Sequence, residues 1–221
     1  SKRITNDLSS DKIHIYHGLS NELPIGIEKT GIKTVVTIHD LIFIRYPELF
    51  REIDRKIYHK KFTYACKKAD IIIAVSEQTK KDIIQYFKIP ENKISVVYQG
   101  CNEVFKHEIT LKKRNSTLRK YKLPENYLLY VGTIEERKNL LTILKTIKKI
   151  PNQKLVVIGN GSTYKEKCLK YISENRLNDR VFILSDIQLN EIASIYQSAE
   201  IMIYPSIFEG FGIPILESLF S

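Results

Sequence analysis

The sequence lacks the features that mark several protein classes. It contains 9 Gly and 7 Pro among 221 residues, which excludes a collagen-like or low-complexity chain. No apolar run approaches the roughly 20 residues of a membrane-spanning helix. The charges of residues 1–7 are not followed by an apolar segment, so we expect no signal peptide. Cysteine is scarce: an odd set of three, without CxxC spacing, argues against a disulfide scaffold and predicts buried, inert thiols in a reducing cytoplasm, at Cys66, Cys101 and Cys168.

What is present is the composition of a globular chain, 43% hydrophobic and 10% aromatic. The length suits one large domain or two small ones. The net charge is +10, with the densest basic stretch at Lys106–Lys122. A basic chain suits anionic partners such as nucleotides, nucleic acid or anionic lipid, and a solvated lysine-rich surface explains the charge equally well. Because the basic residues lack interleaved aromatics or a groove-entering motif, we expect no nucleic-acid partner.

Short apolar runs alternate with helical patterns along the chain, which predicts an α/β fold with parallel strands. The expected strands are Ile13–Tyr16, Val35–Ile38, Ile71–Val75, Ile94–Tyr98, Tyr127–Val131, Leu155–Ile158, Val181–Leu184 and Ile201–Tyr204. The expected helices are Glu48–Ala69, Glu77–Phe87 capped by Ser76, Leu140–Ile150 capped by Asn139, Tyr164–Asn175, Asn190–Ser198 and one that begins near Pro214. We therefore expect two Rossmann-like domains, at 1–105 and 124–221, joined by a basic linker at 106–123.

Ligands of open parallel sheets bind where strands end, so the loops after the strands are the candidate sites. After Tyr127–Val131, Gly132 permits a tight turn, and Arg137 and Lys138 precede a helix N-terminus, whose N–H groups and dipole favour an anion. This pattern indicates a diphosphate site, and two surface cations before a helix are the alternative. After Leu155–Ile158, Gly159 begins a Gly-Asn-Gly turn that should lie beside the first loop, and an ordinary strand-to-helix turn is the alternative.

The loop after Ile201–Tyr204 contains two carboxylates eight residues apart, Glu209 and Glu217. With Pro214 in the first turn of a new helix, we place Glu217 in that turn too, so that both carboxylates can converge on one pocket. A carboxylate suits the vicinal hydroxyls of a sugar or ribose. Gly210 and Gly212 offer unobstructed N–H groups, and surface glutamates around a glycine-rich turn are the alternative.

In the first half, His39 and Asp40 follow the run Val35–Ile38. An imidazole at the end of a strand can bond a substrate or a phosphate. Alternatively, the two side chains cap a turn together.

These segments resemble a known family. Residues 209–217, from Glu209 through Phe211 to Glu217, resemble the E-x7-E signature of retaining GT-B glycosyltransferases, specifically glycosyltransferase family 4. Residues 130–139 are similar to the family's VGT…RKN motif. Residues 37–48 look like the HDL…YPE segment of its mannosyltransferase-like branch, and residues 69–76 and 97–105 fit as well.

The resemblance implies roles for the matching positions in a hexosyl transfer with retention of configuration. Glu217 would hold the ribose hydroxyls of a nucleotide sugar, Glu209 with the Phe211 and Gly212 amides would contact the transferred sugar, and Arg137 and Lys138 would bind the diphosphate. The implied catalytic residues are His39, which faces the sugar from the other domain, Arg137, Lys138 and Glu209; the implied donor-binding residues are Gly132, Gly159, Gly210, Phe211, Gly212 and Glu217.

The branch commonly uses GDP-mannose, although no residue here fixes the base or the sugar. Because no DxD pair follows a strand, we expect no catalytic metal, and the resemblance implies no cofactor besides the donor as co-substrate. The acceptor is expected to be a glycan or lipid-linked glycan. The basic surface is compatible with peripheral contact to the inner face of the plasma membrane.

Both domains are shorter than the family's, so we expect a fragment or truncated gene product. The alternatives to an active transferase are an inactive fragment that binds a nucleotide or partner, and a GT-B phosphorylase, which needs a pyridoxal-phosphate lysine that no motif here indicates.

Overall fold

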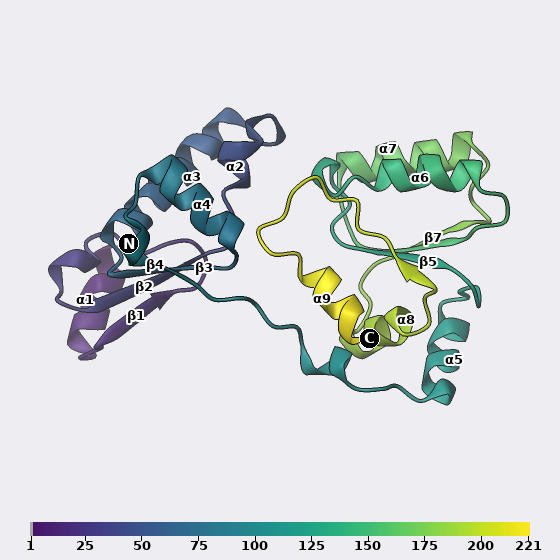
Figure 1. Cartoon of the computed structure of the whole chain (residues 1–221), viewed down its shortest axis with the longest axis horizontal. Helices are drawn as coiled ribbons and strands as arrows, with labels where there is room; N and C mark the ends of the chain where they lie inside the picture. The colour runs from purple at the N-terminus through teal and green to yellow at the C-terminus, as the bar shows by residue number, and fades with distance from the viewer. Residues whose placement is uncertain (1) are drawn as a thin grey trace. The chain divides into compact units, whose positions relative to one another are not determined.

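The computed structural model of the chain describes residues 2–221, which form two compact units (Figure 1). Residue 1, which opens the expected N-terminal domain, lies outside the described residues. Unit 1 comprises residues 1–99 with the short segment 209–211, and unit 2 comprises residues 100–208 and 212–221. Both are α/β units with a four-stranded parallel sheet, as the alternation of apolar runs and helical patterns predicts.

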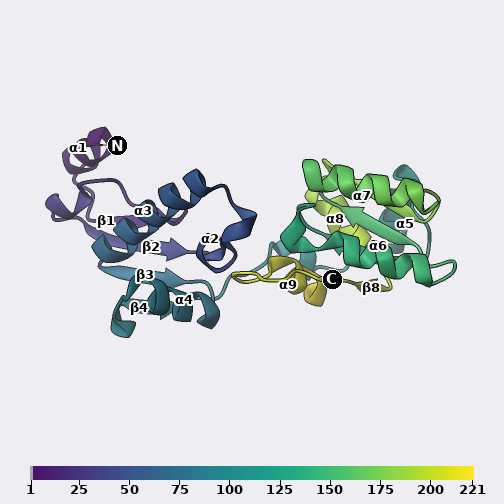
Figure 2. The same ribbon diagram turned by 90° about the horizontal axis from the view of Figure 1, so that it is seen from above.

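Unit 1 orders its strands β1-β2-β3-β4, each parallel to the next. Its elements are α1 (Lys2–Ser10), β1 (Ile15–Gly18), η1 (Ile27–Lys29), β2 (Lys33–Ile38), α2 (Ile42–Arg45), η2 (Pro47–Leu49), α3 (Glu52–Lys68), β3 (Ile71–Ala74), α4 (Glu77–Phe87), η3 (Glu91–Lys93) and β4 (Ile94–Val96). The strands follow one another across the sheet in chain order, and α3 and α4 lie on one side of it (Figures 1 and 2).

The two faces of the unit 1 sheet differ in burial. Val36 and Ile38 of β2 and Ile72 of β3 are fully buried beneath the helices. Their neighbours on the opposite face are not: Ile71 is 48% exposed, and Val35 is only half-buried. Within residues 2–221 unit 1 is therefore a two-layer structure whose strands are apolar on both faces but covered on one.

Unit 2 orders its strands β7-β6-β5-β8, so the chain begins in the middle of the sheet and later reverses direction. Its elements are η4 (Glu103–Lys106), α5 (Leu111–Lys120), β5 (Leu128–Val131), η5 (Glu136–Lys138), α6 (Leu140–Lys149), β6 (Leu155–Ile158), α7 (Thr163–Glu174), β7 (Val181–Leu184), α8 (Leu189–Tyr196), β8 (Ile201–Met202) and α9 (Ile213–Phe220). In Figure 1, α6 and α7 lie above this sheet and α5 and α8 lie below it.

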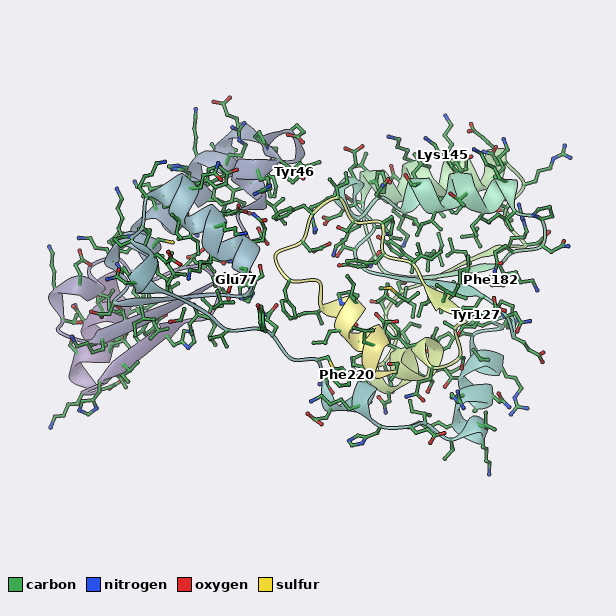
Figure 3. The ribbon with its side chains drawn as sticks, viewed as in Figure 1. Tyr46, Glu77, Tyr127, Lys145, Phe182 and Phe220 are labelled. Atoms are coloured by element: carbon green, nitrogen blue, oxygen red, sulfur yellow. The ribbon has the colours of Figure 1, made fainter. Side chains whose placement is uncertain are left out.

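Because helices cover both faces of this sheet, all four residues of β6 are buried, and the unit has one apolar cluster on each side. Tyr127, just before β5, points into the cluster on the α8 side (Figure 3). Its hydroxyl donates to the carbonyl of Ile195 over 2.6 Å, which satisfies a polar group that would otherwise be buried alone. Burial raises the pKa of this phenol.

The structure differs from the sequence expectations at several elements. Residues 106–123, expected as a linker, contain helix α5 and the end of η4 and lie in unit 2. Helices α1 and α2 were not expected, and the long pattern Glu48–Ala69 is broken into η2 and α3. The expected cap at Ser76 is confirmed, since its hydroxyl accepts the Thr79 N–H at 3.1 Å.

Burial of the cysteines agrees with the expectation at two positions. Cys66 and Cys168 are buried thiols, whereas Cys101 is only half-buried, so the expectation was wrong there. Burial raises the pKa of Cys66 to about 12 and that of Cys168 to about 11, which keeps both thiols protonated and unreactive near neutral pH.

Candidate functional site

The strand order of unit 2 fixes where a ligand can bind. From β5 the chain runs outward through β6 and β7, then returns to place β8 on the other side of β5. At such a reversal, neighbouring strands send their following loops to opposite faces of the sheet, which opens a crevice at the strands' carboxyl ends. By this rule, the ligand-binding crevice of unit 2 is expected between the loop after β5 and the loop after β8, two of the three loops that the sequence singled out.

Two glycines bring the loops after β5 and β6 into backbone contact. Gly132 leaves β5 with φ of 150°, and a β-carbon on Gly159 would lie only 2.0 Å from the Gly132 carbonyl oxygen. The same two loops are also joined by a hydrogen bond of 2.7 Å from the Ile134 N–H to the Asn160 carbonyl. The expectation that these two loops lie side by side is confirmed, and glycine at position 159 is required by the close approach.

Arg137 ties the loop after β5 to the loop after β8. Its guanidinium donates to the Phe208 carbonyl and to the Glu135 carboxylate, each over 2.6 Å, and its side chain is only 14% exposed. The backbone takes part as well, since the Ile207 N–H donates to the Arg137 carbonyl at 2.9 Å. Arg137 therefore holds these two loops together in addition to supplying charge.

Lys138 places a second cation at the same point. Its Nζ donates to the Tyr204 hydroxyl over 2.7 Å and lies 5.0 Å from the centre of that ring. Both cations belong to η5, a short 3₁₀ turn that directly precedes α6, as the sequence predicted. A positive charge and the positive end of a helix dipole thus lie together at the switch point, the place beside β5 where the strand order reverses. Both favour the binding of a diphosphate.

Two details of this helix start differ from expectation. Asn139 has the left-handed conformation (φ 57°) and makes no side-chain cap; its amide oxygen instead accepts the Thr142 hydroxyl at 2.8 Å. The first N–H groups of α6 are also partly used, because the Leu141 N–H donates to the Tyr164 hydroxyl at 3.1 Å. The anion-binding character of this corner thus depends more on Arg137 and Lys138 than on open backbone donors.

Glu217 lies on α9, which begins at Ile213 with Pro214 in its first turn as expected. The expectation that Glu217 shares that first turn was wrong, because it is the fifth residue of the helix. Its carboxylate accepts a 3.0 Å hydrogen bond from Tyr196 of α8. Partial burial raises the pKa of Glu217, and the Tyr196 hydroxyl opposes that rise by stabilising the charged form.

The sequence reasoning missed two tyrosines of this site. Tyr204 holds Lys138 and also lies against Gly212, the residue that caps α9 with φ of 93°. Tyr196 is the partner of Glu217, and burial raises the pKa of its phenol. Only the residue type could have indicated them. A tyrosine at the end of an expected strand, or on the buried side of an expected helix, needs a hydrogen-bond partner for its hydroxyl.

His39 lies in unit 1, directly after β2, as the sequence placed it. Its Nε2 lies 2.8 Å from the Leu19 carbonyl oxygen, and its Nδ1 lies 3.4 Å from the amide nitrogen of Gln99. Asp40 accepts the Ile42 N–H at 3.0 Å and so caps the turn into α2. The ring of His39 and the carboxylate of Asp40 thus have separate partners.

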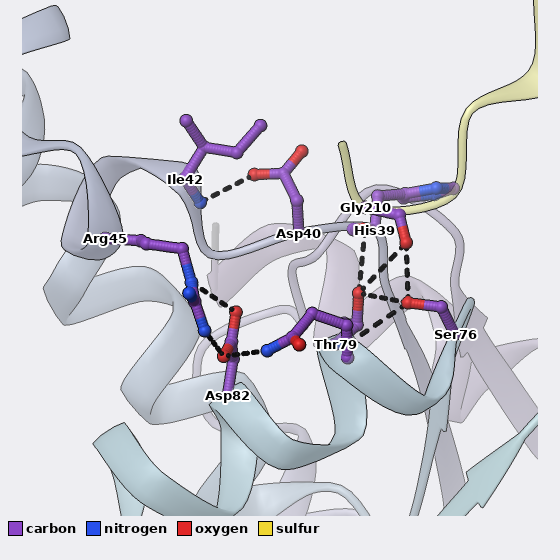
Figure 4. Close-up of polar contacts among 9 residues, drawn as sticks. His39, Asp40, Ile42, Arg45, Ser76, Thr79, Asp82 and Gly210 are labelled. Atoms are coloured by element: carbon purple, nitrogen blue, oxygen red, sulfur yellow. Dashed lines mark hydrogen bonds and ion pairs between the residues drawn. The ribbon is translucent and has the colours of Figure 1, made fainter. Parts of the chain in front are cut away.

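The segment 209–211 belongs to unit 1. The Gly210 carbonyl accepts the Ser76 hydroxyl at 2.6 Å, and a β-carbon on Gly210 would lie 1.8 Å from the His39 carbonyl oxygen (Figure 4). Phe211 lies 6.2 Å from Tyr98 between ring centres. The structure thus brings Gly210 to His39, and glycine is required there by the contact.

Below this contact, the buried carboxylate of Asp82 holds α4 to α2. It accepts from Arg45 at 2.6 Å and from Gln78 at 2.8 Å (Figure 4). Since Thr79 of the same helix also donates to the His39 carbonyl at 3.3 Å, this ion pair helps to fix the end of β2.

The convergence of Glu209 and Glu217 stays a prediction, because the two residues belong to different units. Among residues 2–221, no three His, Cys, Asp or Glu side chains gather in a way that could hold a metal ion. No described helix combines the length and the apolar character needed to cross a membrane.

Sequence comparison finds a similar family for each unit. Residues 2–104 match the family described as Glycosyltransferase Family 4, and residues 113–220 match Glycosyl transferases group 1. The chain is 29% identical over 188 residues to O-antigen chain mannosyltransferase RfbU of Salmonella typhimurium, covering 84% of this chain and 49% of that protein. It is 27% identical over 215 residues to O-antigen chain mannosyltransferase B of Escherichia coli, covering 94% and 55%.

The chain thus spans about half the length of these relatives. Among solved structures, that of Anabaena Alr3699/HepE in complex with UDP-glucose is similar with a TM-score of 0.78 at 15% identity, over 99% of this chain and 60% of that one. This likeness shows the fold. With a match to Glycosyltransferase Family 4 in its first unit and to Glycosyl transferases group 1 in its second, the chain is similar to glycosyltransferases and has the GT-B fold.

Proposed function

We propose that this chain contributes to transfer of a mannosyl group from a nucleotide diphosphate sugar, with GDP-mannose as the donor, to a glycan or lipid-linked acceptor with retention of configuration. The names of two relatives, both O-antigen chain mannosyltransferases, support the sugar and a role in polysaccharide assembly. In this proposal unit 2 is the donor side and unit 1 the acceptor side, in the cytoplasm, and neither a cofactor nor a metal takes part.

The observation that carries the proposal is the pair of cations at the switch point of unit 2. Glycosyl transfer leaves negative charge on the departing diphosphate. Lys138, held by Tyr204, and Arg137, held by Phe208 and Glu135, are already fixed where the β5 and β8 loops meet. Cations that need no reorganisation stabilise developing charge more effectively than mobile ones, which is the electrostatic part of catalysis.

The other side chains receive roles that fit this position. Glu217 would accept hydrogen bonds from the ribose hydroxyls. Glu209 would orient the transferred sugar, with the amides of Phe211 and Gly212, rather than act as a base. His39 would contact that sugar through its ring. Retention then requires no carboxylate nucleophile, because substrate oxygens assist on the same face.

Replacing Glu217 with Gln tests donor binding. A ribose that loses a charged acceptor should bind roughly 10- to 100-fold more weakly, as expected for hydrogen bonds to a charged group. A thermal-shift screen of the 221-residue chain with GDP-mannose, UDP-glucose and UDP-N-acetylglucosamine identifies the donor, and calorimetry gives the affinity of each variant. Glu174→Gln, on the surface of α7, is the matched control. Failure of every donor to bind the unsubstituted chain, or equal affinities for both variants, would contradict the proposal.

The same substitution should stabilise the ligand-free chain. The pKa of Glu217 is raised in the folded state above its ordinary value of 4.5, so ionisation costs folding free energy. That cost is absent below pH 4.5, where the carboxyl is protonated in both states, and is complete above the folded-state pKa. We expect Glu217→Gln to melt at a higher temperature than the unsubstituted chain near pH 7 and at the same temperature near pH 4. A difference that does not vary with pH, or one of opposite sign, would show that burial does not penalise this carboxylate.

Replacing Lys138 with Met tests the diphosphate site, since it removes the charge and keeps the apolar stem. Affinity for the nucleoside diphosphate of the selected donor should fall about tenfold, whereas affinity for the nucleoside alone should not change. The double substitution Arg137→Ala and Lys138→Ala should slow transfer more than it weakens nucleoside binding. Lys145→Met is the control, because Lys145 extends from the outer face of α6 (Figure 3). Equal losses for nucleoside and diphosphate would place the diphosphate elsewhere.

A further inference from the structure

Unit 2 contains a hollow that the proposed reaction does not use. Its volume is about 540 Å³, within the roughly 300–1,000 Å³ of small-molecule sites. Its walls are one side of α5, the segment 123–125 that precedes β5, and the residues 197–198 that follow α8 and precede β8. The hollow therefore lies at the amino ends of β5 and β8, whereas Arg137 and Lys138 follow the carboxyl end of β5.

The helix α5 is fixed against α8 at two points (Figure 1). Near its end, Glu191 of α8 accepts hydrogen bonds from Lys120 at 2.5 Å and from the Tyr121 hydroxyl at 2.7 Å. Nearer its start, Nη1 of Arg114 donates to the Gln197 carbonyl at 2.9 Å. The walls of the hollow are thus held in place by hydrogen bonds between the elements that form them.

Arg114 lines the hollow and has hydrogen-bond donors that the chain does not use. Its Nε–H is buried and has no acceptor among residues 2–221. Its Nη2 forms no hydrogen bond with any residue in that range, and its guanidinium has no carboxylate partner there. A buried donor on a charged group that lacks an acceptor costs folding free energy, and a ligand that supplies the acceptor removes this cost.

Two other arginines show what the same pair of atoms binds. Arg45 holds Asp82 with Nε at 3.3 Å and Nη2 at 2.6 Å, and Arg51 holds Asp54 with Nε at 2.8 Å and Nη2 at 3.3 Å. These two nitrogens form a planar fork that matches two oxygens of a carboxylate or a phosphate. The fork of Arg114 therefore needs an anion from another molecule.

The rest of the wall indicates that this anion is part of an organic molecule. Arg119 adds a second positive charge to the wall, which contains one carboxylate, Glu125, so the wall is positive overall. The wall also presents apolar surface from three leucines, of which the first is 66% exposed: Leu111, Leu118 and Leu123. A free inorganic anion would leave the leucines in water, and a neutral apolar molecule would leave the donors of Arg114 without acceptors.

We propose that this hollow binds a small organic anion, a phosphate ester or a carboxylate. The anion bonds Nε and Nη2 of Arg114, and the organic part packs on Leu111, Leu118 and Leu123. The site lies wholly within unit 2, at the opposite end of β5 from the proposed diphosphate site. It depends on neither the donor nor the transfer reaction, so failure of one proposal leaves the other intact.

Calorimetric titration of the 221-residue chain with phenyl phosphate tests the site. We expect saturable binding at least about tenfold tighter than that of phenol, which has the same ring without the charge, or of inorganic phosphate. Phenylacetate in a parallel titration distinguishes a carboxylate site from a phosphate site. NMR locates the ligand: the amide signals of Asn115 and Ser198 should shift at saturation, and those of Gly132 and Gly159 should not.

Two substitutions remove the proposed anion contacts. Arg114→Lys keeps the charge and removes the fork, and it should weaken phenyl phosphate binding about tenfold. Because Arg114 also bonds Gln197, the exposed residue Arg119 supplies a second test that leaves this contact intact, and Arg119→Glu should weaken binding about tenfold as well. Lys112→Glu, at an exposed position of α5 outside the hollow, is the matched control. Melting temperatures verify that the variants fold.

Several results would overturn this proposal. One is the absence of binding by both phenyl phosphate and phenylacetate. Another is phenol or inorganic phosphate that binds as tightly as phenyl phosphate. A loss for Lys112→Glu as large as that for Arg119→Glu would show a general charge effect, and NMR shifts at Gly132 in place of Ser198 would place the anion at the other end of β5.

Discussion

The reversal of strand order at β5 is the constraint on which the rest of unit 2 depends. Because β6 and β8 flank the same strand, their following loops meet the β5 loop at one edge of the sheet. Because Gly159 has no side chain, the backbone of the β6 loop packs directly against the backbone of the β5 loop at Gly132. Arg137 then joins the β5 and β8 loops through hydrogen bonds. The cations are therefore held in place by the same contacts that join these loops.

Much of this arrangement follows from the sequence, and the parts that do not have identifiable causes. The strands β6 and β7 and helix α4 were predicted to the residue, because continuous apolar runs and a Ser76 cap leave little freedom. Helix α5 was missed because half of its ten residues are charged and its packing on α8 is a tertiary effect that periodicity does not report. The position of Glu217 was displaced by part of a turn, since the helix begins at Ile213 and not at Pro214.

Glu217 and Arg137 show why residue type alone does not settle a role. The sequence identifies both as polar groups beside glycine-rich turns. The structure shows that Arg137 is a structural tie as well as a charge, and that Glu217 is held at an energetic cost that Tyr196 partly offsets. A carboxylate kept partly buried against its own preference is typical of a group retained for a ligand.

The most direct test of the central claim is to map the donor by NMR on the 221-residue chain. On addition of GDP-mannose, the amide signals of Gly132, Gly159 and the residues around Lys138 should shift together, with saturation at the affinity measured by calorimetry. Shifts confined to unit 1, or signals at the β5, β6 and β8 loops that do not change at saturating donor, would contradict the account.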